Sequence, residues 1–354
     1  GLILGTMVIQ SQIRYLNNTR LGFEEEYVVT FSGRHLNTDF ETFRQELIRR
    51  ASIQNVSTGV PPGMGWRNMT TQISAQNQER IGIEILEVGY DYTDVMNINL
   101  VQGRGFSRAF PGDSGHAIIL NKTTVQELGF GEDPLGELVE LPMYGDGQVI
   151  GVVEDFHNSS LHEEIQPVIL KLNPGFGNQI LVQIQPGNVS GAIEDLRQVW
   201  NRFVPTRPFD FTFLDERIDQ QYQEEKTLGQ MALLFTSLAI ILAFLGLFGL
   251  SAYSAQQRTQ EIGIRKVFGA GLLDIVSLLS WDFLKLVAIA VMISIPLVYY
   301  GIQQWLQNFA YHVDVRPGLS MTTIGIALLL TIFSVSWQAL KAGAQNPVDT
   351  LRYE

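Results

Sequence analysis

The stretch from Asp215 to Ala270 constrains the fold more than any other part of the chain. No charged side chain occurs between Lys226 and Arg258, and the apolar run Met231 to Tyr253 inside that segment is 23 residues long. Because about 20 apolar residues suffice for a helix to cross the hydrocarbon core of a bilayer, this run predicts a transmembrane helix. The run continues a polar segment without proline, so we expect one unbroken helix.

The polar segment predicts a stalk that carries this helix out of the membrane. Beginning near Asp215, a helix of about 40 residues would be roughly 60 Å long and could pass movement from one side of the membrane to the other. The residues that we assign to this stalk are Asp215, Ile218, Gln221 and Tyr222.

Two further uncharged segments follow, and each is long enough to span a bilayer. We place the three spans at about residues 231–253, 284–303 and 319–339. The uncharged residues 1–13 predict the end of a first membrane helix whose start is missing. A signal peptide is the alternative, but no basic region and no small-x-small cleavage site precede Arg14.

The charge distribution predicts the orientation in the membrane. Residues 1–226 hold 17 basic and 30 acidic side chains, whereas residues 227–354 hold 7 and 6. The loop after the first complete span carries Arg258, Arg265 and Lys266, and the positive-inside rule therefore places this loop and the C-terminal tail in the cytoplasm. The acidic segment then lies outside, and its charge argues against a nucleic-acid partner.

The segment of about 200 residues between the first two spans predicts an α+β domain. The chain has no cysteine, so this domain must fold on its hydrophobic core alone. Strand patterns alternate with short helices, including a helix from Thr38 with a capping box to Glu41 and a nearly continuous strand from Gln148 to His157. Further elements are expected at residues 27–31, 81–89, 92–96, 117–120, 123–128, 167–172, 180–185, 190–203 and 209–214.

The sequence EDFHNSSLHEE holds the densest group of metal-ligand residue types, with His157 and His162 flanked by four carboxylates. A spacing of five fits neither a helical pair of ligands nor a known zinc motif, so we expect these residues to be structural. No GxxxxGK[ST], GxSxG or HExxH motif occurs in the sequence. We therefore expect a chain that is not an enzyme and holds neither a metal nor a cofactor.

The basic loop mixes charged and apolar side chains in a way that topology alone does not need. Such a short amphipathic helix, followed by the amphipathic segment LLDIVSLLSWDFLK, is what docking onto a cytoplasmic partner requires. The residues that we assign to the docking element are Arg258, Glu261, Ile262, Ile264, Arg265, Lys266 and Phe268.

Several of these motifs together resemble the permease subunits of the FtsX-like/MacB-type ABC transporter family, and the resemblance covers nearly the whole chain. They are FLDERIDQQYQEEKTLGQ, QRTQEIGIRKVFGA, FGEDPLGE, VIGVVEDFH and the ending ALKAGAQNPVDTLRYE. The resemblance implies a multi-pass α-helical membrane protein with an α+β extracytoplasmic domain and four transmembrane helices, the first of them truncated here. The expected domains are residues 1–13, the MacB-like core 14–214, and the stalk and permease part 215–354.

The resemblance also implies a mechanism and partners. An ATP-binding cassette subunit binds the nucleotide, docks on residues 257–270 and drives the outer domain by mechanotransmission, for export or efflux. A second permease unit is expected, either as a homodimer partner or as a fused half, in which case this chain is the C-terminal half of a two-unit permease. A periplasmic adaptor and membrane lipids are further expected partners. The implied location is the bacterial cytoplasmic (inner) membrane.

Two other classes of function remain open at this stage. A membrane-anchored regulator or sensor, for example one that activates a cell-wall hydrolase, needs a cytoplasmic signalling domain, yet only short loops and a tail from Lys341 are expected inside. A membrane-tethered enzyme needs a convergent catalytic set, which the sequence does not indicate. The transported or regulated substrate is not encoded in any motif.

Overall fold

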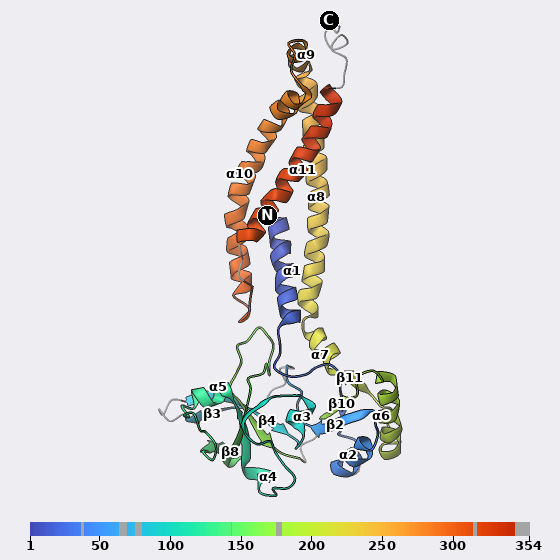
Figure 1. The fold of residues 1–354 in the computed structure, drawn as a ribbon, viewed down its shortest axis with the longest axis vertical. Coiled ribbons are helices and arrows are strands. Elements are labelled where there is room, and N and C mark those ends of the chain that lie inside the picture. Colours follow the sequence, from blue (N-terminus) through green and yellow to red (C-terminus); the bar gives the residue numbers. More distant parts are fainter. Residues whose placement is uncertain are drawn as a thin grey trace. The chain divides into compact units, whose positions relative to one another are not determined.

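The computed structural model describes residues 1–36, 39–63, 69–74, 80–142, 144–174, 179–313 and 317–343. These residues form two compact units (Figure 1). The membrane unit comprises residues 1–18 and 224–354, and the outer domain comprises residues 19–223. Thr38, and with it the expected capping box, lies outside the described residues.

The membrane unit consists of helices. Three of the described helices are long and apolar enough to cross a membrane, namely α8 (Gln223–Gln257), α10 (Leu272–Leu306) and α11 (Pro317–Gly343). They contain the three expected spans, and the amphipathic segment after the basic loop is the first part of α10 rather than a separate helix. The short helix α9 (Thr259–Val267) lies between α8 and α10 in the chain.

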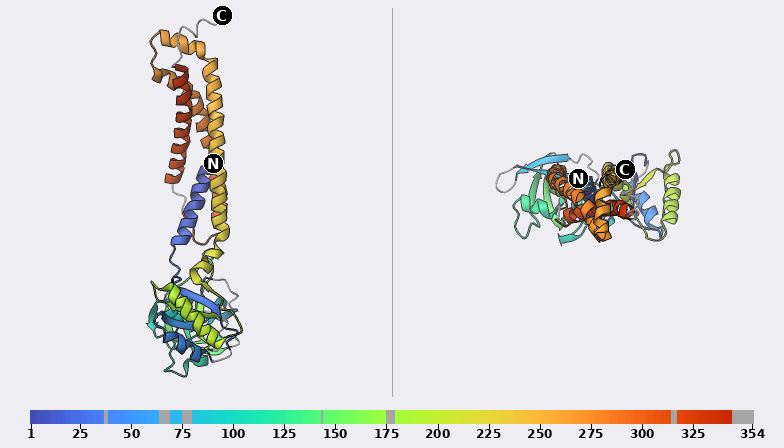
Figure 2. Two further views of the ribbon diagram at one scale, coloured as in Figure 1. Left: turned by 90° about the vertical axis from the view of Figure 1, so that its right-hand side faces the viewer. Right: turned by 90° about the horizontal axis from the view of Figure 1, so that it is seen from above.

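Helix α1 (Leu2–Asn18) runs beside α8 in both views of the membrane unit (Figures 1 and 2). Thr6 Oγ1 and Thr236 Oγ1 lie 2.6 Å apart, and Gln10 Nε2 donates to the Gly229 carbonyl over 3.2 Å. Side-chain hydrogen bonds between helices are a common means of association in lipid, where burial of apolar surface supplies little. That α1 is a fourth span stays a prediction.

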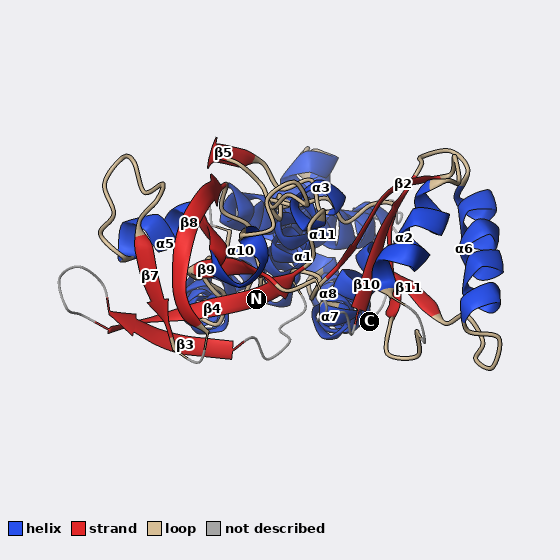
Figure 3. Cartoon of the chain, turned by 90° about the horizontal axis from the view of Figure 1, so that it is seen from below, coloured by secondary structure: helices blue, strands red, loops and turns tan. Residues whose placement is uncertain are grey.

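The outer domain contains two sheets (Figure 3). The first, which we call sheet A, is antiparallel with the order β11–β1–β10–β2. Helices α2 (Phe40–Ile48) and α6 (Val189–Phe203) cover it, because each places apolar side chains three or four residues apart on one face. The hydrophobic core between sheet A and these two helices includes Phe31, Phe43 and Trp200. The strands are β1 (Val28–Ser32), β2 (Ile53–Thr58), β10 (Gln179–Ile184) and β11 (Phe211–Phe213).

The second sheet, sheet B, is mixed and has the order β3–β4–β9–β6–β8–β5, with β7 paired to β8. Its central strand β9 (Val168–Leu172) is buried on both faces, which explains why all of its residues except Lys171 are apolar. Short helices α3 (Tyr92–Val95), α4 (Asp113–His116) and α5 (Lys122–Glu127) connect the strands. The other strands are β3 (Met69–Ser74), β4 (Arg80–Val88), β5 (Leu100–Gly103), β6 (Ala117–Asn121), β7 (Leu138–Leu141) and β8 (Gly145–Val153).

The expected strand from Gln148 to His157 ends early. Strand β8 stops at Val153, after which the Glu154 amide donates to the Asn99 carbonyl and Asp155 accepts a hydrogen bond from the Thr123 amide. These two contacts turn the chain out of the sheet. The extended segment that the apolar pattern predicted is therefore a strand followed by an ordered loop.

The expectation of one unbroken stalk helix is wrong. Helix α7 (Leu214–Gln221) ends at Tyr222, whose backbone (φ −99°, ψ 17°) is not helical, and α8 begins at the next residue. Tyr222 is buried, and its hydroxyl accepts a hydrogen bond from the Leu161 amide. Helix α7 belongs to the outer domain, because it follows β11 directly and packs on β1, so that domain extends past residue 214.

Candidate coupling surface

The turn between α8 and α9 is tied to α10 by an ion pair. Arg258 Nη2 lies 2.9 Å from Asp282 Oδ2, and the Thr259 hydroxyl donates to the carbonyls of Ala255 and Gln256. The Ile262 amide donates a hydrogen bond to the Arg258 carbonyl over 2.9 Å, so helical hydrogen bonding continues through the turn. The orientation of α9 is therefore set by both neighbouring helices.

Ile262 anchors α9 to the rest of the membrane unit. Its side chain is only 4% exposed and belongs to a cluster with Ala255, Phe283 and Val335, from α8, α10 and α11. Sequence analysis assigned Ile262 to the docking surface, but in this structure its side chain is not available to a partner. The reason is the helical periodicity, which turns Ile262 towards the bundle and Ile264 away from it.

The opposite face of α9 is apolar and exposed. Ile264 and Val267 are each at least half exposed, and Phe268 is 87% exposed. Arg265 pairs with Glu261 over 2.9 Å on the same helix, a spacing that supports helix formation. Lys266 also lies in α9, and the structure describes its backbone alone. Several exposed apolar side chains gathered on one helix face are typical of an interaction site.

Glycine ends α9 immediately after this phenylalanine. Gly269 adopts φ 90°, a conformation that glycine accepts and other residues rarely do, and the Ala270 amide donates to the Arg265 carbonyl over 2.9 Å. The Gly271 amide then donates to the Asp274 carboxylate, which lies in the first turn of α10. Phe268 therefore immediately precedes the turn that leads from α9 into α10.

A groove of about 910 Å³ lies between α9 and the first turns of α10. Its walls include Arg265 and Phe268 on one side and Trp281 and Asp282 on the other. Trp281 is exposed and lies under the ammonium of Lys285. The groove thus combines aromatic surface with charges of both signs, an arrangement that suits a protein partner.

The stalk residues expected from the sequence lie on or just after α7. Asp215 lies in the first turn of α7, where its carboxylate accepts a hydrogen bond from the Glu216 amide, and Ile218 is half-buried near Gly63. Gln221 is the last residue of α7, and Tyr222 forms the break before α8. These residues therefore lie where the outer domain ends and the long membrane helix begins.

The two histidines expected to be structural lie in different surroundings. His157 is buried, and this burial lowers its pKa below the usual value, although the nearby Asp155 opposes the shift. His162 shares a hydrogen bond with Ser160 and stacks on the Tyr222 ring, with centroids 6.3 Å apart. Among the described residues, no three histidines or carboxylates are grouped as metal ligands. The structural role stays a prediction.

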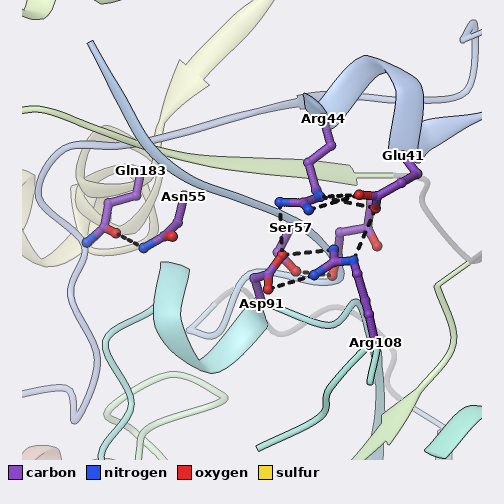
Figure 4. Close-up of polar contacts among 8 residues, drawn as sticks. Glu41, Arg44, Asn55, Ser57, Asp91, Arg108 and Gln183 are labelled. Atoms are coloured by element: carbon purple, nitrogen blue, oxygen red, sulfur yellow. Dashed lines mark hydrogen bonds and ion pairs between the residues drawn. The ribbon is translucent and has the colours of Figure 1, made fainter. Parts of the chain in front are cut away.

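A charged network in the outer domain was not anticipated (Figure 4). Arg44 and Arg108 each pair with both Glu41 and Asp91, so the network joins α2 to the start of α3 and to the loop after β5. Burial opposes ionisation of Glu41, but hydrogen bonds and charge from Arg44 and Arg108 outweigh it and lower its pKa. Glu41 and Arg44 lie one helical turn apart, but Asp91 and Arg108 lie far from them in the sequence, so no local pattern indicates the whole network.

Two family models match the chain. A model described as MacB-like periplasmic core domain matches residues 1–199, and a model described as FtsX-like permease C-terminal matches residues 233–347. The first covers more than half of the chain.

Curated relatives have related names. The chain is 22% identical over 332 residues to the macrolide export ATP-binding/permease protein MacB of Bdellovibrio bacteriovorus, which covers 86% of this chain and 50% of that protein. It is 25% identical over 255 residues to the probable syringafactin export ATP-binding/permease protein SyfD of Pseudomonas syringae pv. tomato, with coverage of 66% and 38%. The chain thus spans about half the length of the relatives it matches.

A solved structure of the periplasmic region of MacB from Actinobacillus actinomycetemcomitans also matches. It aligns with 59% of this chain and 98% of its own length, at 19% identity and a TM-score of 0.42.

Proposed function

Since this chain belongs to the FtsX-like/MacB-type permease family of ABC transporters, we propose that it is a permease that couples ATP hydrolysis in the cytoplasm to movement of its outer domain. In this mechanism of mechanotransmission, an ATP-binding cassette subunit binds and hydrolyses the nucleotide. Its movement enters the permease at α9, passes along α8 and changes the conformation of the outer domain.

The observation that carries this proposal is that α9 has one face buried in the bundle and another face exposed. Ile262 fixes the helix to the bundle, while Ile264, Val267 and Phe268 offer an exposed apolar face beside the Arg258–Asp282 pair. An element that transmits force needs both a firm attachment and a free docking face. A loop that only obeyed the positive-inside rule would need neither.

The nucleotide must come from a partner, or from a part of the protein outside this sequence, because no P-loop motif occurs here. The matched relatives are named ATP-binding/permease proteins and are about twice as long as this chain. We therefore propose an ATP-binding cassette subunit as the first partner. A second permease unit and a periplasmic adaptor are further partners in this proposal.

We propose that the direction of transport is export across the bacterial inner membrane. Relatives are named for the export of a macrolide and of syringafactin. Both names point to export rather than to regulation, so the regulator is not the function we favour. The outer domain would act on its cargo outside the lipid, and the membrane helices would carry force.

Topology and partner capture together test the proposal. Single cysteines are introduced at two exposed positions, Gln198→Cys in α6 and Gln260→Cys in α9, into a sequence that contains no cysteine. An impermeant thiol reagent on whole cells should label the first and not the second. The tagged chain should also co-purify an ATP-binding cassette subunit, and its absence together with labelling at residue 260 contradicts the proposal.

A further inference from the structure

The loop that follows β8 contacts both of the connections that lead from the outer domain to membrane helices. We call residues Glu154–His162 the clamp segment. One connection begins at Thr19, after α1, and the other ends at Tyr222, immediately before α8. The clamp segment includes the EDFH motif, for which the proposed coupling mechanism supplies no role.

The first connection is held by its backbone. The His157 amide donates to the Leu21 carbonyl over 2.8 Å. Gly22 adopts φ 84°, and a Cβ on it would lie 2.5 Å from the Asp155 carbonyl oxygen and 2.8 Å from Phe156 Cα. Any side chain at position 22 would therefore collide with the clamp segment, so the close approach requires glycine.

The second connection is held by the tyrosine that interrupts the stalk. The Leu161 amide donates to the Tyr222 hydroxyl over 2.9 Å, and the His162 ring stacks on the Tyr222 ring with an interplanar angle of 17°. Leu161 and Tyr222 are both buried. A third contact joins the two sides, since the Asn158 carbonyl accepts the Gly63 amide and Gly63 lies against both Phe23 and Ile218.

The clamp segment is attached to sheet B through the chain and through hydrogen bonds. It continues directly from β8, Asp155 accepts a hydrogen bond from the Thr123 amide at the start of α5, and Asn158 donates to Glu84 on β4. Helix α7, in contrast, continues directly from β11 of sheet A and ends at Tyr222. Tyr222 is therefore attached through the chain to sheet A and through its side chain to the clamp segment of sheet B.

We propose that the clamp segment is a mechanical relay, in which Tyr222 converts displacement of the outer end of α8 into movement of sheet A relative to sheet B. This proposal rests on the proposed function and names the residues that receive the force. A rigid, unbroken stalk would move the outer domain as one body. The break at Tyr222 lets α8 change direction against α7, while the hydrogen bond to Leu161 passes the change to sheet B.

The test uses the full chain assembled with its ATP-binding subunit in nanodiscs. Tyr222→Ala removes both contacts with the clamp segment, and Tyr222→Phe removes the hydroxyl alone. Gln220→Ala is the matched control, because Gln220 is an exposed residue of the same helix. Spin labels at Asn201→Cys beside sheet A and Gln126→Cys on α5 beside sheet B, both exposed, report the distance between the sheets by double electron–electron resonance.

The proposal expects a distance change on addition of a non-hydrolysable ATP analogue in the parent chain and in Gln220→Ala. Tyr222→Ala should lose that change while the complex still assembles and hydrolyses ATP at the parent rate, and Tyr222→Phe should lose part of it. A parent-like change in Tyr222→Ala overturns the relay. So does a parent complex that hydrolyses ATP without any distance change.

Hydrogen exchange of the chain without nucleotide separates failure of the relay from failure of the proposed function. Tyr222→Phe should speed exchange of the Leu161 amide about fivefold, the effect of one lost hydrogen bond. Tyr222→Ala should also speed exchange in residues 19–23, which the clamp segment contacts through the His157 amide. Unchanged exchange there overturns the relay, even where the chain fails to assemble with an ATPase and the proposed function is wrong.

Discussion

Arg258 and Asp282 form an ion pair in which Nη2 and Oδ2 lie 2.9 Å apart, joining the turn before α9 to α10. Both side chains are partly exposed, so the pair contributes at most about 1 kcal/mol to stability. We expect the pair to fix the orientation of α9 rather than to stabilise the bundle.

A charge exchange tests this orientation. Arg258→Asp places two carboxylates together and should weaken capture of the ATP-binding subunit, with little change in melting temperature. The double variant Arg258→Asp/Asp282→Arg restores an attractive pair and should recover capture. If the double variant captures no more than the single one, Arg258 contacts the partner itself rather than orienting α9.

Ile262 and Phe268 should respond to truncation in opposite ways. Ile262→Ala removes buried atoms from the cluster with Phe283 and should destabilise the membrane unit by about 2–5 kcal/mol. Phe268→Ala removes a solvent-exposed ring and should leave the melting temperature of the isolated chain nearly unchanged. Thermal unfolding in detergent compares the two variants, and equal losses would show that α9 packs differently from this structure.

Gly229 permits the close approach of α1 to α8. A Cβ at this position would lie 2.5 Å from Ile13 Cδ1, whereas Gly246 on the same helix has no atom within 4 Å. Gly229→Val should therefore separate α1 from α8 and weaken the contact between Gln10 and the Gly229 carbonyl. Gly246→Val, the matched control, should have no such effect. Crosslinking of cysteines placed on α1 and α8 measures the separation.

Asp113 should make the outer domain sensitive to acid. Hydrogen bonds from Arg104, 2.6 and 2.7 Å long, lower the pKa of this buried carboxyl, although its burial opposes the shift. Because the folded-state pKa is the lower one, the stabilisation is complete above the unfolded value of about 3.9 and is lost as pH falls towards the folded value.

Melting temperatures of the full chain at pH 7, 5, 4 and 3 check this dependence. Asp113→Asn should cost about 1.5–3 kcal/mol at neutral pH, because it removes charge-assisted hydrogen bonds. The difference between parent and variant should then shrink below about pH 4. Asp133→Asn, at an exposed carboxyl, is the control for the change in net charge. A difference that stays constant down to pH 3 would rule out the proposed role of Asp113.

Sequence patterns predicted the parts of the fold that local physics determines. The membrane spans follow from length and hydrophobicity, and α6 follows from the spacing of its apolar residues. Strands β2, β3 and β5 were missed, since their sequences lack a clear alternation of apolar and polar residues; all four residues of β5 are exposed.

Long-range contacts account for what the sequence could not predict at the candidate sites. The break at Tyr222 depends on Leu161 and His162, about 60 residues earlier, and the helix formers around it favour an unbroken helix. The burial of Ile262 depends on Phe283 and Val335, which lie on other helices. The composition of α9 indicated a docking helix, but not which of its apolar residues face the bundle.

The central claim is that force enters at α9 and passes on through the segment around Tyr222. The most direct measurement compares Phe268→Ala and Gln221→Pro for capture of the ATP-binding subunit, ATP hydrolysis and function in cells. Phe268→Ala should weaken capture by more than about 1 kcal/mol, or fivefold, as expected for a ring at an interface centre. Gln221→Pro disrupts the end of α7, so it should leave assembly and hydrolysis intact and abolish function. Normal assembly of Phe268→Ala, together with failed assembly of Gln221→Pro, would contradict the account.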